Sequence, residues 1–310
     1  RDERHSALLG HLALIQELLR PDPDLFRALS AAARLALYIL ALTAAGLALF
    51  DLAFGRRIAD EERALLRRVG AWLSVGGAMA AVAWLAAQVG LASDGNPLDG
   101  ETWSFVATMP PGLSVWAVVA GFAIIGLAMA FRIPAALPAQ ALGAVLIAVS
   151  FTLVGHTTQH PPRALLASLL VVHLLGAAFW VGGLWPLARA AQNARPSEAA
   201  ALVEGWARAA SWLVAALAAA GLILAWLIVG SVETLFGTRY GVALLAKVAL
   251  VAVLMGFAAW HRFRLTPALA AGASGAGRRL SRSIAAEAVV MVLVLWAVSE
   301  LTATSPMGDG

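Results

Sequence analysis

Three of the six histidines, at positions 156, 160 and 173, lie close together in the sequence and are its strongest chemical feature. Imidazole binds copper, zinc and iron. Because the chain has no cysteine, only His and Met side chains could hold a soft metal ion. His173 lies in the apolar stretch SLLVVHLLGAAFWVGGLWPL, where an imidazole needs a polar partner or a metal. We expect His156 and His173 to bind a metal, with His160 as a further candidate, and a hydrogen-bonded packing role is the alternative for His173.

Two methionines lie in polar segments at the ends of apolar stretches. Met109 lies in the acidic loop of residues 92–111, and Met307 lies in the C-terminal segment SPMGDG. Their thioether sulfurs could bind Cu(I). The other methionines fall inside apolar stretches and are predicted to pack; they are Met79, Met129, Met255 and Met291.

Three further ionisable residues fall within apolar stretches, where a charge is costly. Lys247 and Glu300 lie at similar depths on neighbouring stretches, so they could form an ion pair that fixes helix register or part of an ion path. Glu287 lies about one turn inside its stretch. Either His261 or Arg262 could reach Glu287, and a structural role is the preferred interpretation there.

The composition places all these residues in a membrane protein. Of 310 residues, 61% are hydrophobic and 13% are charged, whereas soluble domains carry about 25% charged residues. Eight apolar windows are long enough to cross a bilayer as helices. An all-α, polytopic bundle of about eight transmembrane helices is therefore predicted. The windows run approximately over 35–54, 70–91, 113–131, 134–155, 164–187, 209–230, 242–260 and 284–303.

The distribution of arginines predicts how this bundle is oriented. Most arginines lie in the links after the first, third, fifth and seventh windows, so these links are expected in the cytoplasm and both termini in the periplasm. Residues 31–310 then form one bundle in a bacterial inner membrane, with lipid as its surroundings. Residues 1–30 are predicted to form an interfacial helix and a tail, because Leu8, Leu12, Ile15 and Leu19 share one helical face. The start without Met or a signal-peptide pattern fits a chain whose natural N-terminus has been removed.

Several function classes are disfavoured by the same sequence. It lacks a phosphate-binding glycine loop, a Ser-His-Asp set and an HExxH motif, so hydrolytic chemistry and enzyme activity are not expected. The surplus of 22 basic over 18 acidic residues reflects membrane topology rather than nucleic-acid binding. Gly176, Gly182 and Gly183 follow His173 and should let a neighbouring helix approach closely.

Three stretches resemble the copper resistance protein D (CopD) family of bacterial inner-membrane proteins. The resemblance covers about residues 155–306. The first stretch combines VGHTTQHPPR with HLLGAAFWVGGLWPL, and the other two are YGVALLAKVALVAVLMGFAAWHRFRLTPAL and SIAAEAVVMVLVLWAVSELTATSP. The resemblance implies about eight spans, a role in copper resistance or uptake, and cooperation with a small periplasmic copper carrier, CopC. The positions that match the family motifs are His156, His173, Lys247 and Glu287.

The chain also departs from that family pattern. Many relatives have a histidine in the first span, where this chain has Leu37 and Tyr38, and relatives usually have Asn at the position of His261. Tyr38, a methionine or Glu300 could replace the missing ligand, or the site could be two-coordinate, which Cu(I) tolerates.

The residues and the resemblance together favour a copper-handling protein that takes up copper from the periplasm and moves it inward, with Cu(I) as the expected ion. The alternative is a b-type haem electron carrier, which needs two imidazoles facing each other across the haem. A third option is a metal-free structural subunit of a membrane assembly.

Overall fold

A computed structural model describes residues 23–131, 136–155, 162–229 and 231–301, and every regular element in these ranges is helical. Eight helices are long and apolar enough to cross a membrane, which confirms the predicted all-α bundle. They lie on α2 (Pro23–Phe54), α3 (Asp60–Ala92), α5 (Pro110–Ala130), α6 (Ala136–Ser150), α7 (Arg163–Asn193), α8 (Pro196–Val229), α10 (Arg239–Trp260) and α12 (Ala276–Leu301). The span on α6 continues to Leu153 and the span on α10 continues to Ala270. The helix predicted near the N-terminus lies outside the described residues.

Short helical elements join some of these spans. They are η1 (Gly55–Arg57), α4 (Gly100–Thr108), η2 (Phe151–Leu153), α9 (Val232–Gly237), η4 (His261–Leu265) and α11 (Thr266–Ala270). η4 is a single π-helical turn that continues α10. Such turns are rare and occur frequently at functional sites.

Four helices begin well before the predicted windows. α2 starts at Pro23 rather than near Leu35, so residues 23–30, which were expected in the N-terminal tail, belong to this helix, and α12 starts at Ala276 rather than near Ile284. α3 starts at Asp60 rather than near Gly70, and α8 starts at Pro196 rather than near Ala209. The first turn of α3 carries three acidic residues, which the positive end of the helix dipole stabilises. A hydropathy window detects only the part of a helix inside hydrocarbon, so it misses these charged extensions.

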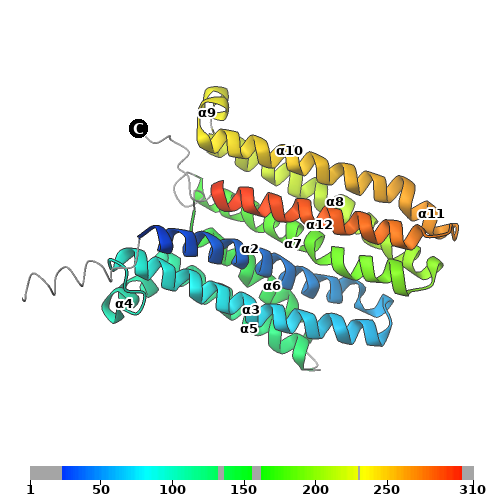
Figure 1. Cartoon of the computed structure of the whole chain (residues 1–310), viewed down its shortest axis with the longest axis horizontal. Helices are drawn as coiled ribbons and strands as arrows, with labels where there is room; N and C mark the ends of the chain where they lie inside the picture. The colour runs from blue at the N-terminus through cyan, green and yellow to red at the C-terminus, as the bar shows by residue number, and fades with distance from the viewer. Residues whose placement is uncertain (1–22, 132–135, 156–161, 230, 302–310) are drawn as a thin grey trace, which may run out of the picture.

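Helix α2 lies at the centre of the bundle. It packs against α3, α6 and α7, and it is the most buried of the eight spans. α10 is the least buried and contacts mainly α12. In Figure 1, α3 and α5 lie on one side of α2, while α7, α12 and α10 follow on the other.

Both described ends of the chain lie at the same end of the bundle (Figure 1). The opposite end holds η1, the α7–α8 link and α11, and we call it the arginine-rich end because Arg56, Arg57, Arg195 and Arg278 lie there. An even number of spans explains this arrangement. The assignment of the arginine-rich end to the cytoplasm remains a prediction from the sequence.

Glycines of α2 and α7 let these two helices approach each other closely. A Cβ atom added to Gly46 would lie 2.0 Å from the carbonyl oxygen of Ala178, and one added to Gly182 would lie 2.0 Å from the carbonyl carbon of Gly46. The two backbones are therefore in direct contact. Gly183 faces the Trp206 side chain of α8 instead.

Candidate functional site

His173 projects from α7 towards α8 and is half-buried. Its Nδ1 atom lies 3.1 Å from the backbone carbonyl oxygen of Leu217. A carbonyl oxygen can only accept a hydrogen bond, so Nδ1 carries the proton and donates it. The lone pair of the neutral ring then lies on Nε2. Histidines that bind metals almost always donate their other ring N–H in this way, which fixes the ring orientation.

Gly221 gives the His173 ring room against α8. A Cβ atom added to Gly221 would lie 3.1 Å from Cε1 and 3.3 Å from Nδ1 of His173. Both distances are shorter than ordinary van der Waals contacts. A side chain at position 221 would therefore press against the ring at its hydrogen-bonding edge.

Lys247 lies on α10, inside a membrane-spanning segment as His173 does. It is half-buried, and within the described part of the chain it has no hydrogen-bond or ion-pair partner. The side chain of Glu300 lies outside that part, so the expected Lys247–Glu300 pair remains a prediction. An unneutralised ammonium group would repel a cation at His173, which favours a paired lysine.

Glu287 connects α12 to α7 and to the π-helical turn η4. The carboxylate is buried and accepts a hydrogen bond of 2.7 Å from Nε1 of Trp180. Nδ1 of His261 lies 3.4 Å from its second oxygen, and Nε2 of His261 lies 2.8 Å from the Ser283 hydroxyl. Of the two partners considered for Glu287, the structure thus places His261 beside it, whereas Arg262 donates to Ser211.

Of the remaining candidates, the structure describes only Met109 and Tyr38. Met109 lies between α4 and α5 and is partly exposed. Tyr38 lies on α2 with its ring centroid 5.4 Å from that of Phe151. His156, His160 and Met307 lie outside the described residues, so the expected convergence of imidazoles remains a prediction. Within the described ranges, no three His, Asp or Glu side chains form a group able to hold a metal ion.

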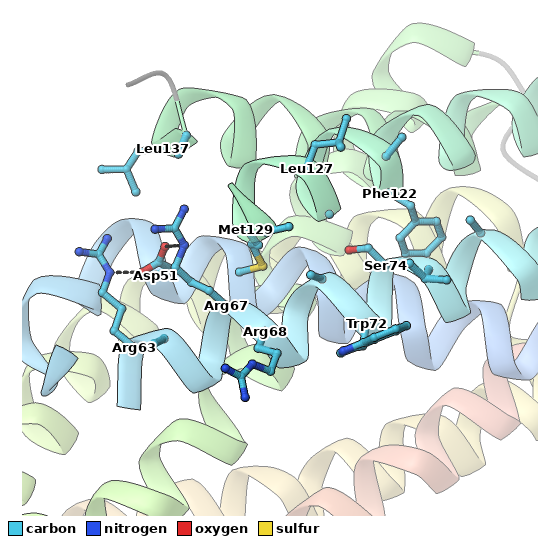
Figure 2. Close-up of a pocket in the computed structure, with 18 of the residues that line it drawn as sticks. Asp51, Arg63, Arg67, Arg68, Trp72, Ser74, Phe122, Leu127, Met129 and Leu137 are labelled. Carbon is cyan, nitrogen blue, oxygen red and sulfur yellow. Dashed lines mark hydrogen bonds and ion pairs between the residues drawn. The ribbon is translucent and has the colours of Figure 1, made fainter. Parts of the chain in front are cut away.

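A buried polar network at the arginine-rich end was missed by the sequence analysis. The Asp51 side chain of α2 is fully buried and accepts hydrogen bonds from Nε of Arg63 at 2.6 Å and from Nε2 of Gln140 at 3.0 Å. Nε of Arg67 lies 3.8 Å from its second oxygen, as Figure 2 shows. The available signal was an aspartate inside the first apolar window, followed by arginines at the start of the next helix.

Comparison with known proteins finds relatives of both halves of the chain. Residues 200–301 match the family model described as copper resistance protein D, and residues 24–162 match the model described as copper resistance protein D-like, N-terminal domain. The similarity therefore extends into the N-terminal half, beyond the stretches that carried the resemblance.

A curated relative, copper resistance protein D of Pseudomonas syringae pv. tomato, is 30% identical over 202 residues. The aligned region covers 59% of this chain and 64% of the relative, so the chain spans just under two thirds of the relative's length. No solved structure matches the chain.

Proposed function

Because the chain belongs to the copper resistance protein D family, we propose that it acts in copper homeostasis by moving copper inward through its helical bundle. The observation that carries the proposal is the orientation of His173. Its Nδ1–H is used by the Leu217 carbonyl, so Nε2 is free to act as a ligand inside a membrane-spanning helix.

Copper is the substrate in this proposal, and Cu(I) is the expected ion. It is delivered on the periplasmic side of the inner membrane by a small carrier resembling CopC. His156, with Met109 or His160, then accepts the ion at the outer end of the bundle, and His173 receives it deeper inside. Imidazole and thioether ligands suit Cu(I). Since the sequence has no nucleotide-binding motif, ion gradients or carrier affinity must drive the movement.

The haem alternative gains no support from the relatives, whose descriptions concern copper resistance. A haem protein purifies with a strong Soret absorption band, whereas a Cu(I) protein does not. An absorption spectrum of the purified protein separates the two functions directly.

Substitution of His173 by alanine tests the proposal. We expect wild-type protein to bind copper and to carry it into proteoliposomes, and His173→Ala to lose affinity by more than the roughly 10- to 100-fold that an outer-shell partner contributes. Metal analysis and chelator competition measure the binding. His261→Asn is the matched control, since it removes a different intramembrane imidazole while keeping a side chain that can hydrogen-bond to Ser283. Unchanged copper affinity in His173→Ala would refute the ligand role.

Substitution of Gly221 by alanine tests the same site through the space that Gly221 leaves for the His173 ring. The added methyl group would push the His173 ring away from the Leu217 carbonyl. We expect copper affinity to fall by about 10-fold or more, the range reported for loss of an orienting partner. Gly256→Ala is the control, because a Cβ atom there meets nothing within 4 Å. Equal affinities of the two variants in chelator competition would contradict the assigned ring orientation.

A further inference from the structure

An open groove runs along the outer surface of α3 and α5 from the arginine-rich end towards the middle of the membrane. Its volume is about 1390 Å³, and the ends of α2 and α6 close one side of it. Figure 2 shows the polar end with Asp51, Arg63, Arg67 and Arg68, followed along α3 by Trp72 and Ser74. The groove is thus polar at one end and apolar along the rest of its length.

The polar end retains unused hydrogen-bond donors. Arg63 is paired with Asp51, and one terminal nitrogen of Arg67 donates to the carbonyl of Ala128. Nε of Arg67 is buried beside Asp51 and is not accessible to a ligand. Arg68, in contrast, is exposed with no ion-pair partner among the described residues, so its donors are available. Asp60 also lines this end. Asp51 and Arg63 neutralise each other. The other charged groups at this end are Arg67, Arg68 and Asp60, so the polar end of the groove carries a net positive charge.

The apolar part of the groove has the length of one lipid leaflet. Trp72, Val75 and Met79 line it and are at least half exposed. From Arg68 to Met79 the helix rises about 17 Å at 1.5 Å per residue, close to half of the ~30 Å hydrocarbon thickness. Arg68 directly precedes the apolar part of α3, so its guanidinium group lies at headgroup depth.

We propose that this groove is a binding site for an anionic phospholipid of the leaflet at the arginine-rich end. The phosphate accepts hydrogen bonds from Arg68, the positive charge of Arg67 lies beside it, and one acyl chain lies along Trp72, Val75 and Met79. Guanidinium groups form strong charge-assisted hydrogen bonds with phosphate. A zwitterionic lipid would bring a positively charged ammonium group towards the same arginines, so the site favours a headgroup without a cation. The proposal does not depend on copper transport.

Native mass spectrometry of the delipidated protein tests this site with phosphatidylglycerol and phosphatidylcholine that carry identical acyl chains. We expect the wild-type protein to bind phosphatidylglycerol about tenfold more tightly, because both lipids offer the same phosphate but only phosphatidylcholine brings a cation close to the arginines. Arg68→Gln should reduce that preference to near unity. Arg278→Gln is the control, because Arg278 is exposed at the same end of the bundle but outside the groove.

A second pair of variants tests where the acyl chain lies. Ala123 is exposed and lines the groove, so Ala123→Phe should fill it and weaken binding of both lipids. Ala120→Phe places the same ring on an exposed position of α5 outside the groove and should change neither affinity. Equal binding of the two lipids, no effect of Arg68→Gln, no effect of Ala123→Phe, or full competition by millimolar inorganic phosphate would each overturn the proposal.

Discussion

Replacement of Asp51 by alanine is expected to destabilise the folded protein by about 3–5 kcal/mol, the cost of breaking a buried ion pair from one side. The Asp51 side chain is fully buried and pairs with Arg63. Its removal would also leave the amide of Gln140 without its acceptor and place Arg67 near an unneutralised Arg63. Thermal unfolding in detergent and the yield of monodisperse protein measure the effect.

The exposed Asp24–Arg27 pair of α2 provides the matched control for this prediction. Both of its side chains are more than two-thirds exposed, and such pairs contribute about 0.2–1 kcal/mol. Asp24→Ala should therefore leave the unfolding temperature nearly unchanged. Asp51→Asn, which keeps an acceptor oxygen but removes the charge, should fall between the two. A loss in Asp51→Ala no larger than in Asp24→Ala would show that the network is not part of the stable core.

The spans were predictable from the sequence because hydrocarbon imposes a simple rule on the chain. A helix must carry about 20 apolar residues to cross the bilayer, so windows of that length locate all eight spans. The charged N-terminal extensions of α3 and α8 lie outside hydrocarbon, so they do not need apolar residues. Hydropathy contains no information about where such a helix begins.

The partners of polar residues could be predicted from the sequence only where both residues lie at the same end of two neighbouring spans. Glu287 and His261 lie at the same end of neighbouring spans, so their proximity followed from antiparallel packing. Asp51 is held by Gln140 of α6, which is far away in the sequence and carries no charge. Only the tertiary structure brings these two residues together. The tautomer of His173 likewise depends on one carbonyl group of α8, which no sequence pattern identifies.

The α2–α7 contact holds the region around His173 and Glu287 against the region around Asp51. α7 carries His173 and Trp180, whereas α2 carries Asp51 and packs against α3, which lines the groove. Glycines 176, 182 and 183 of α7 indicated that a helix would approach closely, but not which one. The structure shows that Gly182 meets the backbone of Gly46. The position of the candidate copper ligand relative to the first half of the bundle therefore depends on this contact.

Replacement of Gly182 by alanine is accordingly expected to destabilise the folded protein strongly, as Asp51→Ala does. The added methyl group would overlap the backbone of Gly46, which cannot rotate away as a flexible side chain could. Overpacking typically costs 1–3 kcal/mol, and contact with a backbone should reach at least about 3 kcal/mol. The unfolding temperature in detergent and the fraction of protein that stays monodisperse provide the measurement.

Gly76→Ala is the control for this substitution, because its added methyl group would only touch the Leu40 side chain at 3.8 Å. Alanine also has the higher helix propensity, so Gly76→Ala should be neutral or slightly stabilising. Gly46→Ala should reproduce the loss seen in Gly182→Ala, since it forces apart the same two backbones. The double variant should then lose less than the sum of the single losses, because one separation of α2 and α7 relieves both overlaps. Strict additivity would show that the two glycines do not share one contact.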